Sequence, residues 1–225
     1  MFSLAETNLS GPILVVGLGR FGAALALTLV ASGQEVLGVD NDLARVQQYA
    51  DRLTHIVQAD STDEEAMRQI GASDFQRAVV AIGSGIEASV LTTGLLVDLE
   101  IRAIWAKAIS RDHGRILQRI GAHHVVYPEA DMGERVAHLV SGGMLDYIRF
   151  DSEFALAKLV APASISRGSL GSLGLRSKYG VTVVGVKEPG REFTYADRET
   201  VVQPGSLIAI AGRIEDVDHF AREVR

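Results

Sequence analysis

The hexapeptide Gly-Leu-Gly-Arg-Phe-Gly at positions 17–22 constrains the fold of this chain more than any other feature. It fits the pattern G-x-G-x-x-G, directly follows an apolar run and directly precedes a stretch with helical periodicity. The next apolar run ends on an acidic residue, Asp40. Strand, glycine-rich turn, helix and acid in this order are typical of the first unit of a Rossmann-type nucleotide-binding domain. The alternative is a glycine-rich turn that arises by chance, with Asp40 as an ordinary helix cap. It does not explain why strand, turn, helix and acid occur together in this order.

The alternation of strand-like and helical patterns continues along the first half of the chain. Apolar runs typical of strands lie at residues 13–17, 35–40, 54–58, 78–82, 103–106 and 124–127. Patterns with apolar residues at three- and four-residue spacing separate them at residues 21–31, 42–51, 63–70, 87–99 and 111–120. This regular alternation predicts an α/β fold with a doubly wound parallel sheet and crossover helices.

The pattern changes after Pro128. One further helix is expected at residues 132–140, ended by two glycines, and an extended segment follows at 146–150. Strands are then expected at 154–161, 181–187, 191–194 and 206–211, with helices near 170–178 and 214–224. We therefore predict a Rossmann-type nucleotide-binding domain at residues 11–145 and a small α+β domain at residues 146–225.

Composition limits the classes of function. The formal net charge of −6 argues against a general nucleic-acid-binding surface, because such binding depends on Lys and Arg that neutralise phosphates. The chain has no cysteine, which removes disulfides and thiolate metal sites. No apolar run approaches the length of a membrane-spanning helix. We expect a cytoplasmic protein that binds no nucleic acid.

The glycine-rich turn predicts a phosphate site. Gly17 permits the tight turn, Gly19 lets a phosphate approach the backbone, and Gly22 lets helix and strand pack closely. The first N–H groups of the helix, around Arg20 and Phe21, then face the anion. A cation in the first helical turn opposes the helix dipole, so we expect Arg20 to meet the terminal phosphates of a nucleotide. The alternative is a surface arginine without a ligand.

Polar residues at the ends of later strands predict the nucleoside side of the same site. Asp40, followed by Asn41, can accept hydrogen bonds from both ribose hydroxyls and would repel a 2′-phosphate, which disfavours NADP. Other candidates follow the third and fourth strands, at the sheet edge where open α/β sheets bind ligands. Plain helix caps or turns would account for the same residue types. These candidates are Asp60, Ser61, Ile82, Gly83 and Ser84.

Three charged or titratable residues follow the fifth and sixth strands. Lys107 ends the fifth strand and His113 lies one turn into the next helical pattern, so either could reach a phosphate. A solvated helix position is the plainer interpretation of His113. Glu129 follows Tyr127-Pro128 and is first interpreted as an acid at a helix N-terminus.

The sequence contains no motif for catalysis. A nicotinamide-dependent enzyme needs a proton donor or acceptor beside the hydride acceptor, and no Tyr-x-x-x-Lys pair occurs. Gly-x-Ser-x-Gly and histidine-rich metal spacings are also missing. We predict a regulatory protein rather than an enzyme. The alternatives are an NAD(H)-dependent oxidoreductase and an NAD(H)-sensing regulator; a redox-sensing DNA-binding repressor would need a basic winged helix that we do not find.

Several longer segments carry a resemblance to a known family. They are GLGRFG at 17–22, AIGS at 81–84, EAS at 87–89, LTT at 91–93, WAKA at 105–108, IGA at 120–122 and YPEADMG at 127–133. In this order they resemble the KtrA/TrkA family of potassium-uptake regulatory subunits, built from an RCK_N (KTN) and an RCK_C domain. The resemblance covers nearly the whole chain. It implies a homo-oligomer, with dimers assembled into an octameric ring, beneath a membrane K⁺ transporter of the KtrB/TrkH kind.

The resemblance also implies ligands. The first domain would bind ATP or ADP, and NAD or NADH in some members, with ATP favouring potassium flux and ADP the resting state. By motif, Arg20, Lys107 and His113 would contact phosphates, and Asp40 the ribose. Asp60 and residues 82–84 would lie on the adenosine side. Glu129 matches the acid that helps to hold Mg²⁺ or another divalent cation near the γ-phosphate.

A second ligand is implied for the C-terminal domain. Residues 175–180 resemble the RCK_C segment that binds cyclic di-AMP between two subunits in some relatives. The match is partial, because Glu188-Pro189 and Tyr195-Ala196 stand where those relatives tend to carry His and Pro. An extra carboxylate there would repel a phosphate.

Overall fold

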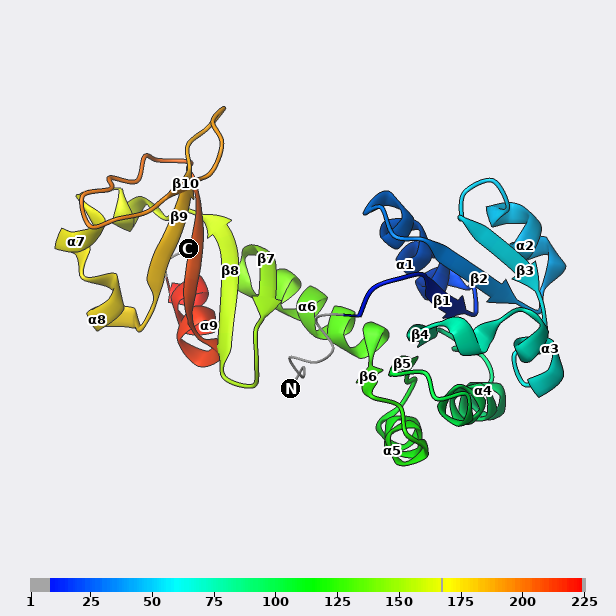
Figure 1. The fold of residues 1–225 in the computed structure, drawn as a ribbon. Helices are drawn as coiled ribbons and strands as arrows, with labels where there is room; N and C mark the ends of the chain where they lie inside the picture. The colour runs from blue at the N-terminus through cyan, green and yellow to red at the C-terminus, as the bar shows by residue number, and fades with distance from the viewer. Residues whose placement is uncertain (1–8, 167, 224–225) are drawn as a thin grey trace. The chain divides into compact units, whose positions relative to one another are not determined.

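The computed structural model describes residues 9–166 and 168–223 (Figure 1). The chain divides into two compact units, Met1–Glu129 and Ala130–Arg225. The division lies before the boundary expected near residue 145, because the helix that was expected to close the first domain has most of its residues in the second unit. Each unit has its own buried core.

The first unit is the expected α/β fold, with six parallel strands in the order β3-β2-β1-β4-β5-β6. The strand order reverses between β1 and β4, which both pair in parallel with their neighbours. The strands are β1 (Ile13–Val16), β2 (Val36–Asp40), β3 (His55–Gln58), β4 (Arg77–Val80), β5 (Ala103–Lys107) and β6 (His124–Val126). The helices are α1 (Arg20–Ala31), α2 (Leu43–Tyr49), α3 (Glu64–Gln69), α4 (Ile86–Asp98) and α5 (Arg111–Ile120), with a 3₁₀ turn, η2, at Ala72–Asp74.

Both faces of this sheet are covered, which is why its central strands, β1, β2, β4 and β5, are largely buried without alternation. Every residue of β1 is buried. Ile13 and Val15 pack with Ala26 of α1 on one face. Leu14 and Val16 belong to the cluster on the other face, with residues of α3, α4 and α5. Strand β1 therefore fixes the turn that follows it from both sides.

The second unit is a five-stranded antiparallel sheet with helices, in the order β10-β9-β11-β8-β7. Its core packs Val217 and Phe220 of the last helix against alternate residues of the central strands. The elements are α6 (Pro128–Gly142), β7 (Met144–Arg149), β8 (Phe154–Val160), η3 (Ala163–Ile165), α7 (Leu170–Leu173), α8 (Leu175–Tyr179), β9 (Thr182–Lys187), β10 (Thr194–Tyr195), β11 (Leu207–Arg213) and α9 (Ile214–Glu223).

Three expectations for this part of the chain were wrong in detail. The helix expected near 170–178 is two short helices, because Gly174 adopts a left-handed conformation with φ of 57°. The strand expected at 191–194 is β10, which begins where that range ends. The helix expected at 132–140 already begins at Pro128, since proline suits the first helical position. Residue 224, at the end of the last expected helix, lies outside the described residues.

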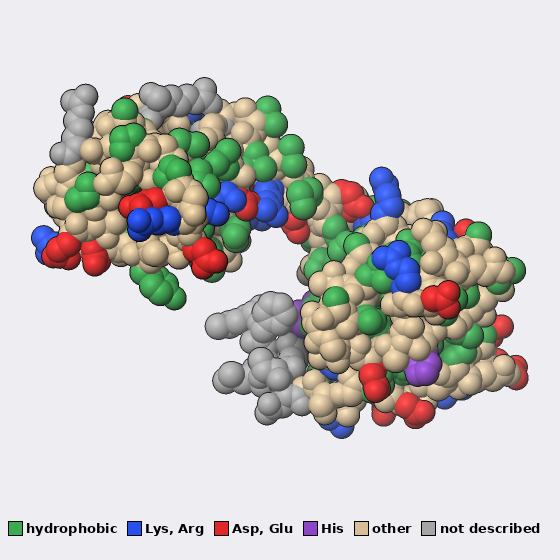
Figure 2. All heavy atoms as spheres, turned by 90° about the horizontal axis from the view of Figure 1, so that it is seen from above, with side chains coloured by type: hydrophobic (Ala, Val, Ile, Leu, Met, Phe, Trp, Pro, Cys, Tyr) green, Lys and Arg blue, Asp and Glu red, His purple; other side chains and the backbone are tan. Residues whose placement is uncertain are grey.

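The surface is mixed in charge. Acidic and basic side chains are interspersed on the face drawn in Figure 2. Within the described part of the chain, no helix combines the length and apolarity that crossing a bilayer requires.

Candidate functional site

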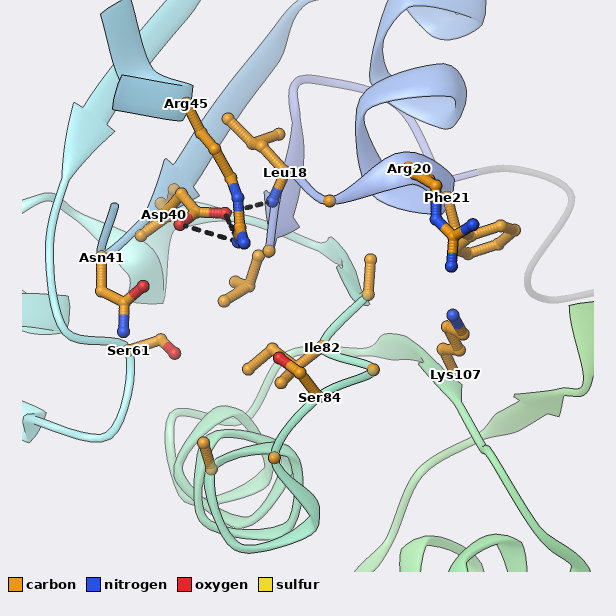
Figure 3. A pocket seen from close by; sticks show the side chains of 18 of the residues that line it. Leu18, Arg20, Phe21, Asp40, Asn41, Arg45, Ser61, Ile82, Ser84 and Lys107 are labelled. Carbon is orange, nitrogen blue, oxygen red and sulfur yellow. Dashed lines mark hydrogen bonds and ion pairs between the residues drawn. The ribbon is translucent and has the colours of Figure 1, made fainter. Parts of the chain in front are cut away.

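A cavity of about 800 Å³ opens at the carboxyl ends of the strands of the first unit, where the strand order reverses (Figure 3). Open α/β sheets bind ligands at this position, because the loops on the two sides of the reversal diverge. The cavity is lined by the turn after β1, the ends of β2 and β5, and the loop after β4. Its volume suits a nucleotide or dinucleotide.

The glycine-rich turn closes one wall of the cavity. Gly17 has a φ of 91°, a backbone conformation that residues other than glycine rarely adopt. A β-carbon on Gly22 would lie 1.9 Å from the carbonyl oxygen of Gly17 and 2.9 Å from Cβ of Ala81. A β-carbon on Gly19 would meet nothing within 4 Å. Two glycines therefore permit close packing, and the third leaves open space over the backbone.

The start of α1 faces this space without a competing group. No side chain caps the helix at Gly19, and the first turn contains no acidic residue. The first N–H groups of a helix lack intrahelical partners and carry the positive end of its dipole. The turn therefore presents backbone donors suited to a phosphate.

Two cations lie at the same end of the cavity. The side chains of Arg20 and Lys107 point toward one another in Figure 3. Nζ of Lys107 lies 2.5 Å from Oε1 of Glu129 and 5.7 Å from the ring centre of Phe21. The hydrogen bond from Lys107 lowers the pKa of Glu129, and the charge of Arg20 adds to this effect. This end of the cavity thus carries two positive charges and one negative charge.

A buried carboxylate marks the opposite end. Asp40 accepts hydrogen bonds from the N–H of Leu18 at 2.6 Å and from the N–H of Asp42 at 2.9 Å. Nη1 of Arg45 lies 3.3 Å from Oδ2 of the same carboxylate, and Figure 3 shows this group beside Leu18. Asn41 and Ser61 lie on the same side of the cavity.

Asp60 and Ser61 have local partners as well. Oδ1 of Asp60 accepts from the N–H and the hydroxyl of Thr62, and the backbone hydrogen bond is the larger cause of its lowered pKa. The hydroxyl of Ser61 is buried, 2.8 Å from that of Thr92. Asp60 does not cap α3, because Asp63 occupies that position.

Most of the predicted site residues line this one cavity, and two do not. Gly22 lies behind the wall, as its packing role requires. His113 is a buried residue of α5 with 2% of its surface exposed, so its interpretation as a solvated helix residue was wrong. Its phosphate contact stays a prediction. The lining members are Gly17, Gly19, Arg20, Phe21, Asp40, Asn41, Asp60, Ser61, Ile82, Gly83, Ser84, Lys107 and Glu129.

His113 contacts a residue that lines the cavity. Its Nδ1 lies 3.4 Å from the backbone nitrogen of Ile109, which lines the cavity. Burial lowers the pKa of His113, and among the described residues its Nε2 has no hydrogen-bond partner.

Sequence reasoning missed several lining residues. The most informative is Arg45, whose only sequence signal is its position in the first turns of α2, five residues after the acid that ends β2. The others are largely apolar or neutral and carry no signal of their own. They are Val16, Leu18, Val39, Gln48, Tyr49, Ala81, Gly85, Ala88 and Ile109.

The side chains do not form a metal site by themselves. Within the described residues, no group of three or more His, Cys, Asp or Glu side chains is arranged to hold a metal ion. Glu129 is a single carboxylate at the cationic end. A Mg²⁺ ion is usually held by one or two carboxylates together with substrate phosphates. The residues therefore fit a cation that arrives with a nucleotide.

Comparison with known proteins gives matches along nearly the whole chain. The TrkA-N domain family matches residues 13–128 and the TrkA-C domain family matches residues 157–225. The Ktr system potassium uptake protein C of Bacillus subtilis is 37% identical over 93% of this chain and 96% of its own length. The Ktr system potassium uptake protein A of the same organism is 36% identical over 93% and 95%.

Solved structures share the fold. The RCK domain of GsuK superposes with a TM-score of 0.66 at 19% identity, over 96% of this chain and 48% of that one. The GsuK channel bound to NAD gives 0.64 at 18% identity, over 95% and 40%. GsuK bound to ADP gives 0.53 at 15% identity, over 60% and 36%. This chain thus spans less than half the length of those GsuK chains.

Proposed function

This chain belongs to the family of Ktr and Trk potassium uptake proteins that combine a TrkA-N with a TrkA-C domain, and on that premise we propose that it is a regulatory subunit that gates a membrane potassium transporter in response to adenine nucleotides. The single observation that carries the proposal is the polarity of the cavity. One end has a buried carboxylate suited to a ribose, and the other has two cations beside an uncapped helix N-terminus.

The polarity orients the ligand. A ribose at Asp40 places the phosphate chain along the glycine-rich turn, since both lie in one cavity. The chain would run toward Arg20 and Lys107, which point toward one another at the far end. Backbone N–H groups of α1 would bind the first phosphates, and the two cations those farther along.

The Lys107–Glu129 pair gives a physical means to distinguish ATP from ADP. Lys107 is buried and already paired with Glu129. A third phosphate would compete with Glu129 for Lys107 and free the carboxylate to hold a divalent cation on the phosphates. Mg²⁺ would supply charge neutralisation there. A ligand shifts a gate only through different affinities for two states, and this exchange of partners offers such a difference.

Association with other copies and with a membrane partner is part of the proposal. We infer an octameric ring assembled from dimers, held at the cytoplasmic face of the membrane by a transporter subunit. The support is membership of the Ktr and Trk family. The proposal includes no catalytic step, because the cavity combines charged ligand-binding groups with no nucleophile paired to a base.

NAD or NADH is the second candidate ligand. A cavity of about 800 Å³ has room for a dinucleotide, and GsuK has been solved bound to NAD. An NAD(H)-sensing regulator would use Asp40 and the glycine turn in the same way. An NAD(H)-dependent oxidoreductase would additionally need a proton donor near the nicotinamide. Steady NADH absorbance across a substrate panel would argue against the enzyme.

Cyclic di-AMP is the ligand proposed for the second unit, where basic and acidic side chains have opposing effects on its binding. Arg176 and Lys178 lie in the last turn of α8 and offer positive charge. The carboxylate of Asp216 adjoins Gly180, where a β-carbon would lie 2.4 Å from Oδ2. A carboxylate at this place opposes the binding of a phosphate.

Calorimetric titration of the full chain with ATP, ADP, NAD and NADH, with and without Mg²⁺, tests the proposal. We expect ATP and ADP to bind, Mg²⁺ to favour ATP selectively, and mass measurement to report an octamer. Potassium flux into vesicles that contain the transporter should be higher with ATP than with ADP. Absence of binding by every adenine nucleotide, or equal flux with ATP and ADP, would exclude this gating function.

A further inference from the structure

Arg45 is a third cation that lines the cavity, and it lies away from the end where the phosphates are proposed to bind. It lies at the nucleoside end, beside the carboxylate of Asp40. Its side chain is 45% exposed, whereas that of Asp40 is 2% exposed. The guanidinium therefore lies between the buried carboxylate and the open cavity.

The carboxylate of Asp40 has few free acceptor positions. Oδ2 accepts from the N–H of Leu18 and Oδ1 from the N–H of Asp42, which holds both oxygens in place at the end of β2. The two backbone bonds leave the outward-facing lone pairs for a ligand. A ribose would use these positions through its 2′- and 3′-hydroxyls.

Arg45 already occupies these positions. Its Nη1 lies 3.3 Å from Oδ2 and 3.5 Å from Oδ1, so a single nitrogen bridges both oxygens. Both distances exceed those of strong charge-assisted hydrogen bonds. Its Nε also lies 3.5 Å from Oδ2 of Asp42, which is a second carboxylate contact of the same side chain.

We propose that Arg45 occupies the position of the ribose diol at Asp40 whenever no nucleotide is bound, and that a nucleotide must displace the guanidinium from Asp40 to bind. Arg45 is then a specificity-determining residue, because it reduces the gain in affinity that a nucleotide obtains from its 2′- and 3′-hydroxyls. This inference rests on the proposed nucleotide function. A guanidinium that only balances the charge of Asp40 would instead affect all nucleotides alike, with or without hydroxyls.

A comparison of ADP with 2′,3′-dideoxy-ADP on the full chain separates these roles. The ratio of their dissociation constants measures the benefit of the diol, and long-range attraction between Arg45 and the phosphates cancels in it. Arg45→Met removes the guanidinium and keeps an apolar stem of similar length. Arg45→Gln is a second variant, and Arg45→Lys keeps the charge. Arg68→Met is the matched control, because Arg68 pairs with Glu64 on α3 away from the cavity.

In Arg45→Met and Arg45→Gln we expect ADP affinity to rise relative to dideoxy-ADP by roughly three- to fivefold, as for loss of a half-exposed ion pair. Arg45→Lys should give a smaller rise, and Arg68→Met none. An unchanged or reduced ratio in both neutral variants would overturn the role of Arg45 and leave the proposed function intact. Failure of the unaltered chain to bind ADP would overturn both.

Discussion

The two units of this chain differ in what they bury. In the described residues, all but one of the buried polar or charged side chains lie in the first unit, Asp40 and Lys107 among them, and the exception is Ser206. The core of the second unit is apolar, and that unit has most of the large exposed apolar side chains, such as Tyr195, Val140 and Phe150. A buried charge is costly unless it has a partner or a function. In the first unit the buried charges of Asp40 and Lys107 line the cavity, whereas the second unit is held together by apolar packing and exposes more large apolar side chains.

The largest expected effect tests whether the two units are stable independently. Phe220→Ala removes a fully buried ring from the second core and should lower its unfolding free energy by about 3 to 5 kcal/mol. Nucleotide binding by the first unit should persist. The single tryptophan, Trp105, lies in β5 and stacks on His124, so its fluorescence reports the first unit alone during thermal unfolding.

Phe150→Ala is the matched control for that variant, because Phe150 is 65% exposed. The Phe150→Ala substitution should change the unfolding free energy of the second unit by less than about 0.5 kcal/mol. If Phe220→Ala abolished ADP binding and shifted the Trp105 transition as well, the two units would form one cooperative body and the comparison would fail.

The next prediction concerns the glycine-rich turn of the first unit. Gly22→Ala places a methyl group against the backbone of Gly17. The substitution should lower the unfolding free energy by about 1 to 3 kcal/mol. It should also remove most of the affinity for ADP, because the turn would be displaced. Gly133→Ala is the control, since a β-carbon there meets nothing within 4 Å. Calorimetry with ADP and the Trp105 melting curve measure both consequences. Retained ADP binding in Gly22→Ala would show that the turn is not the phosphate site.

A smaller effect concerns the ligand alone. Arg20→Ala should weaken the binding of ATP by about 1.5 kcal/mol, or roughly tenfold in the dissociation constant, as expected for loss of a charge-assisted hydrogen bond at an exposed position. Adenosine should be unaffected, and so should the stability of either unit. Titrations of ATP and adenosine with Arg20→Ala and with Arg68→Ala as control measure this. Equal loss for both ligands would place Arg20 away from the phosphates.

The first unit was easier to predict from sequence than the second, for physical reasons. A parallel sheet covered on both faces has strands that are continuous apolar runs, and the glycine pattern marks its first turn. In the second unit, β10 pairs through only two residues, Thr194 and Tyr195. A strand that short has no periodicity to detect. The helix break at Gly174 depends on a left-handed conformation that the residue permits but does not require.

The site could be predicted where a residue acts alone, and not where it depends on a neighbour. The glycines and Asp40 follow from the turn itself. The pairing of Arg45 with Asp40 depends on how α2 packs, which no local pattern records. The burial of His113 had a signal, because buried Leu117 lies four residues later on the same helical face.

A small, pH-dependent effect on stability is expected at Glu129. The hydrogen bond from Lys107 lowers the pKa of Glu129 in the folded chain, so the unfolded chain binds more protons over that range of pH. Its contribution is therefore complete above the ordinary glutamate pKa and is lost as the pH falls through the lowered one. Because the side chain of Glu129 is 62% exposed, Glu129→Gln should cost less than about 1 kcal/mol at pH 7.

The same substitution distinguishes stability from ligand response in the first unit. Glu129→Gln cannot hold a divalent cation as a carboxylate does, so Mg²⁺ should no longer favour ATP over ADP, although ADP still binds. The stability difference between Glu129→Gln and the unaltered chain should shrink as the pH falls below the ordinary glutamate range. Melting curves from pH 7 to below that range, beside calorimetry with and without Mg²⁺, measure both. If the Mg²⁺ preference for ATP survived in Glu129→Gln, the cation would be held elsewhere, and Glu129 would serve only to neutralise Lys107.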